Sequence, residues 1–169
     1  GIENSFRYKN GKLIVDSTKT AARTTTSINV KRPENASAQG IDVSYHQGVI
    51  NWEKVKNTGK VDFAIIRCGY GMNEWNETTQ TWTQDDPQWE YNTSECERLN
   101  IPYGVYLYSY ADTTEKAKSE AEHVIRMLEG KNLSYPIYYD MEDKSVMNNS
   151  KITATKASQI AQTFLNTMK

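Results

Sequence analysis

From Gly40 onward, short apolar runs alternate along the chain with amphipathic stretches of helical length. This alternation is typical of repeated βα units, which build a parallel sheet covered by helices. We predict strands over 40–44, 61–68, 103–110 and 135–141. The second run is almost wholly apolar, as expected of a strand that is buried on both faces. The predicted order is βαβαβαβα, with right-handed crossovers between the strands.

Helix signals follow each predicted strand. The first helix is short and runs from Trp52 through Val55. The second is predicted to be capped by Asp86, with Pro87 at its first position, and to run toward Leu99. These assignments fill the first two gaps between strands.

The third predicted helix carries the clearest pattern. Asp112 is expected to cap it, with Glu115 three residues later, and the helix stops at Gly130. One apolar stripe runs along it, made of Ala117, Ala121, Val124, Ile125 and Leu128. His123 lies beside this stripe and is expected to be a partly exposed surface residue. A last helix over 153–168 repeats the pattern.

Two architectures fit this order of elements, an open doubly wound sheet and the first half of a closed barrel. The open sheet usually carries a phosphate loop or a Gly-rich dinucleotide turn after its first strand, and the segment 42–48 is neither. We therefore favour the closed barrel, an α/β fold of the (β/α)8 TIM-barrel type. The 169 residues fall short of the ~250 of a complete barrel and hold about its first four βα units.

Residues 1–39 differ from the rest of the chain. They are rich in Thr, Lys, Arg and Asn and show little apolar periodicity, which is typical of a tether or linker. The alternative is a short hairpin around the Asn-Gly turn at 10–11, with alternating positions Phe6, Tyr8, Leu13 and Val15. We divide the chain into this N-terminal segment, 1–39, and the N-terminal portion of a barrel domain, 40–169.

Composition limits the classes of partner. Twenty Lys and Arg against 21 Asp and Glu give a formal net charge of -1, so no overall field points to nucleic acid or to an anionic membrane. The two cysteines, Cys68 and Cys96, exclude a disulfide scaffold and leave a single bridge open. No stretch approaches the ~20 apolar residues of a membrane span.

Three carboxylates are the strongest candidates for chemistry. Residues two apart on a strand share a face, so Tyr138, Asp140 and Glu142 point the same way. Like charges held together raise the pKa of one group, and a carboxyl that stays protonated near neutral pH can protonate a glycosidic oxygen. Asp42 ends the first strand, and in a closed sheet it would reach the same rim.

Other roles for these acids compete with catalysis. Acidic residues at strand ends also cap helices or face solvent, and the pattern alone leaves the two interpretations of Asp140 and Glu142 evenly balanced. Clustered carboxylates can also bind a divalent metal. The chain has no calcium loop and no phosphate-binding element, so we expect neither a metal nor a cofactor. His46 follows the first strand and is a candidate substrate contact.

Aromatic side chains are candidates for a sugar-binding wall. Tyr106, Tyr108 and Tyr110 share one face of the third strand, where they either contact substrate or donate to the backbone as buried hydroxyls. Trp75 and Trp82 lie in the polar stretch 71–86, which is predicted to be a long loop. They either contact a glycan or pin this loop to the core.

Four ordered segments resemble glycoside hydrolase family 25, the Chalaropsis-type lysozymes or N-acetylmuramidases. They are Gly40–Gly48, Phe63–Gly71, Ile101–Tyr106 and Tyr139–Glu142, and the likeness covers residues 40 to 168. The resemblance implies a modified (β/α)8 TIM barrel that hydrolyses the β-1,4 bond between N-acetylmuramic acid and N-acetylglucosamine in peptidoglycan, without metal. Glu142 matches the general acid of the family, Asp140 its partner, and Asp42 the aspartate that ends the first strand.

The resemblance also implies about four further strands and another active-site Asp after the last residue, Lys169. We expect the chain alone to have low activity, and its unpaired outer strands to favour association between copies. The expected partner is the peptidoglycan glycan strand, with Tyr106, Tyr108, Tyr138, His46 and Trp75 as substrate contacts. The expected location is extracellular or at the cell surface, with any signal or membrane anchor outside this sequence. A peptidoglycan-binding or self-associating domain without catalysis is the alternative function.

Overall fold

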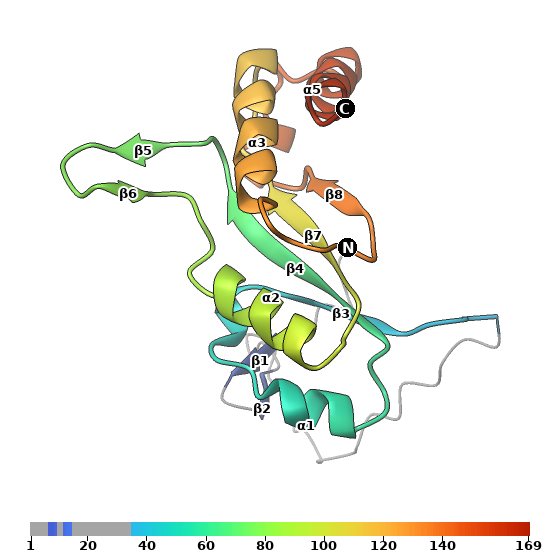
Figure 1. Cartoon of the computed structure of the whole chain (residues 1–169). Helices are drawn as coiled ribbons and strands as arrows, with labels where there is room; N and C mark the ends of the chain where they lie inside the picture. Colours follow the sequence, from blue (N-terminus) through green and yellow to red (C-terminus); the bar gives the residue numbers. More distant parts are fainter. Residues whose placement is uncertain (1–6, 10–11, 15–34) are drawn as a thin grey trace.

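The central element of the fold is a parallel sheet of four strands. A computed structural model describes residues 7–9, 12–14 and 35–169 (Figure 1). The strands lie in the order β3 (Gly40–Val43), β4 (Phe63–Tyr70), β7 (Tyr103–Tyr108) and β8 (Ile137–Asp140). Each strand is parallel to the strand beside it in the sheet, as the predicted βα units require. The α/β prediction is confirmed, and the strand ends differ from the predicted ones by up to two residues.

Helices follow all four strands of the sheet. They are the short 3-10 helix η1 (Tyr45–Gln47), α1 (Trp52–Asn57), α2 (Trp89–Arg98), α3 (Thr114–Met127), α4 (Lys144–Met147) and α5 (Ala154–Thr167). Helices α2 and α3 pack against β4, and α3 packs along α5 (Figure 1). All four predicted helices are present, and η1 and α4 are additional short helices.

The hydrophobic core lies between the sheet and these helices. Alternate residues of β4 and β7, Ala64, Ile66, Val105 and Leu107, are fully buried and face the helical layer. The core is completed from the helices by Trp52, Trp89, Cys96, Ala117, Ala121, Val124, Ile160 and Phe164. The opposite face of the same strands is therefore free to carry polar and aromatic side chains.

Two predicted helix starts are wrong. Helix α2 begins at Trp89 rather than at Pro87, and its N-cap Gln88 makes no side-chain capping bond. The Asp86 carboxylate accepts the backbone N–H of Gln88 through Oδ1 at 2.9 Å and forms a buried ion pair with Arg67 through Oδ2, since a charge in the core needs a partner of opposite sign. Helix α3 is capped by Thr113, one residue after the predicted Asp112, because the Thr113 hydroxyl accepts the backbone N–H of Lys116.

The polar stretch after β4 is a hairpin rather than a plain loop. Its strands, β5 (Trp75–Asn76) and β6 (Thr81–Trp82), pair antiparallel and project from the end of β4 (Figure 1). Trp75 lies directly opposite Trp82, with the two rings edge to face at 5.2 Å. Local cross-strand pairing of these two indoles accounts for the difference from the prediction.

Near the N-terminus, β1 (Arg7–Lys9) pairs antiparallel with β2 (Lys12–Ile14), with Tyr8 opposite Leu13. This pairing agrees with the alternative prediction of a hairpin. Phe6, Val15 and the turn at 10–11 lie outside the described residues, and the division at residue 40 stays a prediction. Cys68 and Cys96 are both buried and free, so they do not form a bridge. In the described part of the chain, no helix is long and apolar enough to cross a membrane.

Candidate active site

A cavity of 920 Å³ lies on the face of the sheet that points away from the helical layer, at the carboxyl ends of the strands. Seven of the eight predicted site residues line it: Asp42, His46, Tyr106, Tyr108, Tyr138, Asp140 and Glu142. They come from the first, third and fourth βα units, as expected when parallel strands end at one rim. The fold therefore brings together side chains that are up to 100 positions apart in the sequence.

Asp140 and Glu142 form the acidic centre of this cavity. Asp140 is the last residue of β8 and is half-buried, whereas Glu142 follows the strand and is exposed. Burial, reinforced by the charges of Glu142 and Asp42, raises the pKa of Asp140 from 3.8 to about 6. The predicted like-charge effect is therefore present at Asp140.

Asp42 reaches the cavity from the other edge of the sheet. Parallel pairing places it beside Ile65, whose side chain also lines the cavity. The capping box formed by Ser44 and Gln47 turns the chain immediately after β3. This turn fixes the segment that follows Asp42 and places His46 at the cavity.

Tyrosines form one wall of the cavity. Tyr106 and Tyr108 lie two positions apart on β7, and both line the cavity. Burial raises the pKa of both phenols, that of Tyr108 to about 12. The Tyr108 hydroxyl donates to Asp143 at 3.3 Å. The carboxylate of Asp143 in turn caps α4 by accepting the backbone N–H of Ser145 at 2.9 Å. Tyr138 is 48% exposed and stands beside the acids.

The sequence interpretation missed a buried cation in the cavity wall, Arg67. Its Nε donates to Asp86 Oδ2 at 2.8 Å, and the same oxygen accepts the backbone N–H of Tyr45 at 3.0 Å. The guanidinium also lies under the Tyr45 ring, 4.9 Å from its centroid. An arginine within an otherwise apolar strand was the available signal, because a buried charge requires a fixed partner.

A second missed residue is Glu120 of α3, which is fully buried behind the site. It accepts hydrogen bonds from the Ser109 hydroxyl, the Tyr139 hydroxyl and the backbone N–H of Tyr110. Glu120 sits on the apolar face of α3, one position before Ala121 of the predicted stripe. A charged residue on that face was the signal for a buried polar network.

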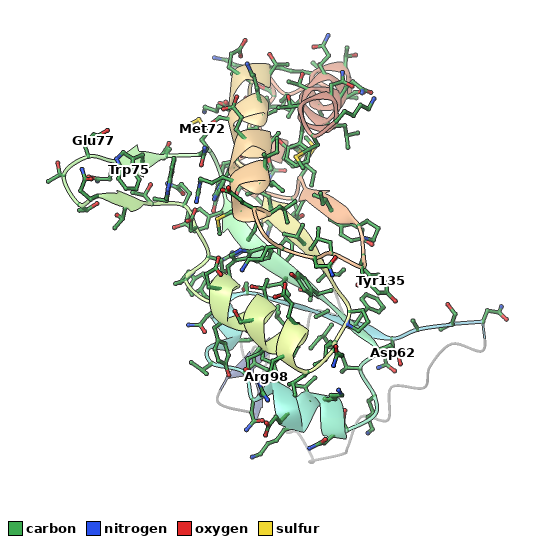
Figure 2. All side chains as sticks on the ribbon, viewed as in Figure 1. Asp62, Met72, Trp75, Glu77, Arg98 and Tyr135 are labelled. Atoms are coloured by element: carbon green, nitrogen blue, oxygen red, sulfur yellow. The ribbon has the colours of Figure 1, made fainter. Side chains whose placement is uncertain are left out.

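Trp75 does not line the cavity. It lies on the projecting hairpin, 40% exposed, with Glu77 further along the same arm (Figure 2). A substrate contact by Trp75 stays a prediction. If it occurs, it involves a part of the glycan outside the cavity.

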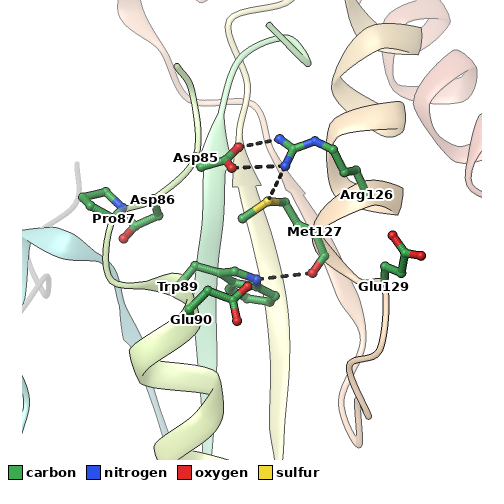
Figure 3. A pocket seen from close by; sticks show the side chains of 8 residues that line it. All are labelled: Asp85, Asp86, Pro87, Trp89, Glu90, Arg126, Met127 and Glu129. Carbon is green, nitrogen blue, oxygen red and sulfur yellow. Dashed lines mark hydrogen bonds and ion pairs between the residues drawn. The ribbon is translucent and has the colours of Figure 1, made fainter. Parts of the chain in front are cut away.

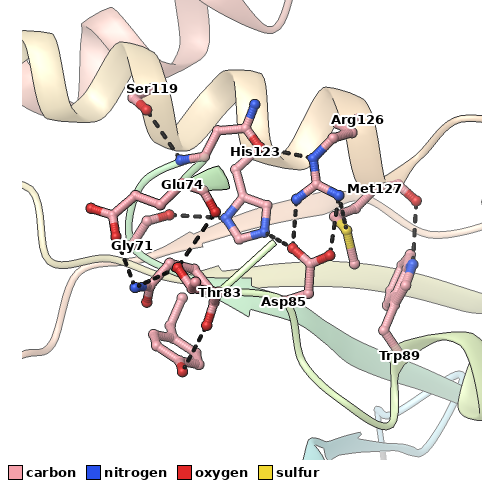
Figure 4. Close-up of polar contacts among 12 residues, drawn as sticks. Gly71, Glu74, Thr83, Asp85, Trp89, Ser119, His123, Arg126 and Met127 are labelled. Atoms are coloured by element: carbon pink, nitrogen blue, oxygen red, sulfur yellow. Dashed lines mark hydrogen bonds and ion pairs between the residues drawn. The ribbon is translucent and has the colours of Figure 1, made fainter. Parts of the chain in front are cut away.

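The base of this hairpin is held to α3 by a polar clamp, which we define as Asp85, His123 and Arg126 (Figure 4). Asp85 Oδ1 lies 2.8 Å from His123 Nε2, and Arg126 contacts both Asp85 oxygens. His123 Nδ1 lies 3.0 Å from the Gly71 carbonyl. His123 is fully buried, so the expectation of a surface histidine is wrong, because these partners satisfy both ring nitrogens.

The clamp borders a smaller cavity of 490 Å³ on the helical side of the sheet (Figure 3). Trp89 forms part of its wall and donates from its indole nitrogen to the Met127 carbonyl at 3.3 Å. None of the three predicted acids lines this cavity. Among the described residues, no group of three or more His, Cys, Asp or Glu side chains is arranged to hold a metal ion.

Fold and site together define a barrel-like α/β protein with carboxylates at its strand ends. The sequence matches the family description "Glycosyl hydrolases family 25" over residues 41–169. The modular autolysin LytC from Streptococcus pneumoniae, solved with a synthetic peptidoglycan ligand, is 31% identical with a TM-score of 0.65. That match covers 96% of this chain and 35% of the LytC chain.

Two more distant structures share the fold. A muramidase from Trichobolus zukalii is 19% identical, with a TM-score of 0.58 over 77% of this chain and 58% of the other. A family 25 glycosyl hydrolase from Bacillus anthracis is 17% identical, with a TM-score of 0.55 over 80% and 58%. A comparison with curated protein sequences finds no match.

The chain belongs to glycosyl hydrolase family 25, since the family match covers most of its residues. Its four-stranded parallel sheet with flanking helices corresponds to part of the family's barrel-like fold. The chain spans about a third of the length of LytC and somewhat over half of the other two structures.

Proposed function

We propose that the cavity cleaves the β-1,4 bond between N-acetylmuramic acid and N-acetylglucosamine, with Glu142 as the general acid. The observation that carries this proposal is the cluster of Asp42, Asp140 and Glu142 in one cavity, with the pKa of Asp140 raised to about 6. The cluster thus retains a proton at a pH where an isolated carboxyl has lost it. A glycosidic oxygen needs such a proton in order to leave.

The roles of the two acids follow from their exposure. Glu142 is exposed to the cavity and can reach a bound glycan, whereas Asp140 is half-buried beneath it. Asp140 keeps the proton within the pair, and Glu142 delivers it to the leaving oxygen. Asp42 adds negative charge from β3, which favours the positive charge that develops on the sugar ring.

The wall of the cavity supplies the substrate contacts. Tyr106, Tyr108 and Tyr138 present rings and hydroxyls, which suit the apolar faces and hydroxyl groups of a sugar. His46 adds a polar group from η1. The proposed substrate is therefore the glycan strand of peptidoglycan, and the proposed place of action is the cell wall or cell surface.

Replacement of the proposed acid tests the function. Glu142→Gln keeps the size of the side chain and removes its proton, so we expect hydrolysis of purified peptidoglycan to fall by about 10²-fold or more. Glu129→Gln, a change in an exposed carboxyl outside the 920 Å³ cavity, is the matched control and should leave hydrolysis unchanged. Hydrolysis is measured as the release of reducing ends, with circular dichroism to confirm that both variants fold.

The same variants separate catalysis from simple binding. The exposed tyrosine and tryptophan rings would also suit a peptidoglycan-binding domain without activity. In that case the wild type and Glu142→Gln would sediment equally with cell walls, and neither would release reducing ends. Wild-type release that Glu142→Gln abolishes, with wall binding retained, supports the enzyme.

A further inference from the structure

The carboxylate of Glu120 is a buried charged group that the proposed reaction does not use. It is fully buried on α3, and its partners among the described residues are three donors without charge. Ser109 Oγ donates at 2.7 Å, the Tyr139 hydroxyl at 2.6 Å and the Tyr110 backbone N–H at 2.8 Å. Burying a carboxylate without a cation costs stability, and burial accordingly raises the pKa of Glu120.

These donors belong to the ends of the two strands that carry the site. Tyr139 immediately precedes Asp140 in β8, and its ring stacks on Phe164 of α5 at 3.9 Å. Ser109 donates its backbone N–H to the Asp140 carbonyl at 2.8 Å, while its hydroxyl donates to Glu120. Two residues therefore link the Asp140 backbone to the Glu120 carboxylate. One is Tyr139, the preceding residue, and the other is Ser109, which donates to the Asp140 carbonyl.

Glu120 also fixes the end of β7. Its second oxygen accepts the N–H of Tyr110, whose side chain lines the cavity. The Ser109 hydroxyl accepts the backbone N–H of Ala111 at 3.1 Å, which continues the network into the next residue. One side chain on α3 thus makes hydrogen bonds at the ends of both β7 and β8.

We propose that Glu120 is a positioning residue, which holds Asp140, and through it Glu142, at the depth in the cavity that the reaction requires. The part that Glu120 plays in the reaction rests on the function proposed above. The positioning itself does not, because it follows from the hydrogen bonds. A carboxyl that moves toward solvent loses part of its burial, so its titration reports its position.

The test is a titration of Asp140 by NMR in the folded chain, labelled with ¹³C at the Asp carboxyls. Glu120→Gln keeps the size and one acceptor but presents an amide where two hydroxyls now donate. We expect the titration midpoint of Asp140 to move from about 6 toward 3.8, by about half a unit or more. Tyr139→Phe, which removes one hydroxyl only, should move the midpoint in the same direction by less. Glu122→Gln, an exposed position on the same helix, should leave it unchanged.

The outcomes are distinct for each variant. If Glu120→Gln does not fold, the shift of the Asp140 titration midpoint in Tyr139→Phe tests the proposal. An Asp140 midpoint equal to that of the wild type in every folded variant overturns the proposal. The titration needs no turnover, so a wild-type chain that fails to hydrolyse peptidoglycan counts against the proposed function and leaves this result standing. In an active chain, Glu120→Gln should lower kcat by about 10-fold with little change in KM.

Discussion

At the scale of single residues, the central feature is the cost of keeping Asp140 half-buried beside two other acids. Its pKa in the folded chain is about 6, above the ordinary 3.8. Between about pH 4 and pH 6 the folded chain therefore binds the proton more tightly than the unfolded chain, and the free energy of unfolding falls as the pH rises through this range. The acid needed for chemistry is thus a source of instability at neutral pH.

This cost makes a stability prediction. Asp140→Asn removes the charge and keeps the shape, so the variant should unfold at a higher urea concentration than the wild type at pH 7. The difference should shrink toward pH 4, where the wild-type carboxyl is itself protonated. Urea unfolding at pH 4, 5.5 and 7 measures it, and parallel pH profiles for the two proteins would contradict the assignment.

The acids of the cavity are predictable from the sequence, whereas the buried groups behind them are not. Asp140 and Glu142 were found because two acids share one face at the end of an apolar run, a pattern that depends on strand period alone. Glu120 and Arg67 depend on which distant side chains meet them in the folded chain. Their partners, Tyr139 and Asp86, lie 19 residues away in each case, and no local pattern encodes that meeting.

At the scale of elements, the hairpin β5–β6 depends on its anchor more than on its own pairing. Its two strands have two residues each, and such a hairpin is marginal in water without tertiary contacts. The polar clamp supplies these contacts, and Arg126 also lies 4.0 Å over the Trp82 ring. Burial alone would raise the pKa of Asp85, but hydrogen bonds from His123 and Arg126 outweigh it and lower that pKa.

Loss of the clamp should therefore release the hairpin alone. In Asp85→Ala we expect amide hydrogen exchange over residues 72–84 to accelerate by about 10-fold or more, because the local opening loses hydrogen bonds to two partners. Exchange in β4 and β7 should change much less. Glu77→Gln, at the exposed part of the same arm, is the control. Equal acceleration across the whole sheet in Asp85→Ala would show that the clamp supports the core rather than the arm.

The elements themselves were largely predictable, and their ends were not. All four parallel strands and their helices follow from the alternation of apolar runs and stripes, which any packed α/β protein must have. The predicted start of α2 was wrong at Asp86, whose carboxylate forms an ion pair with the distant Arg67. The predicted start of α3 was wrong by one residue, because Thr113 caps the helix. The hairpin after β4 was missed because its Trp pair occupies a mostly polar stretch.

At the scale of the whole molecule, the outer strands of the sheet bear on how the chain associates. Among the described strands, β3 pairs only with β4 and β8 only with β7, so each presents one row of backbone groups without a strand partner. Such edges are templates for pairing with another chain. We therefore predict that copies of this chain associate, through β3, β8 or both.

Sedimentation equilibrium over a range of concentrations measures this association. The average mass should rise with concentration above that of one chain, because the added strand pairing is intermolecular. A mass that stays at one chain throughout the range would contradict the prediction.

The proposed activity is hydrolysis of the glycan strands of peptidoglycan by the acids at the carboxyl ends of β3 and β8. Mass spectrometry of a long digestion of purified peptidoglycan tests it most directly, because it identifies the sugar at each new reducing end. We predict reducing N-acetylmuramic acid from the wild-type chain and none from Glu142→Gln. New ends that carry reducing N-acetylglucosamine, or equal release by the two proteins, would contradict the claim.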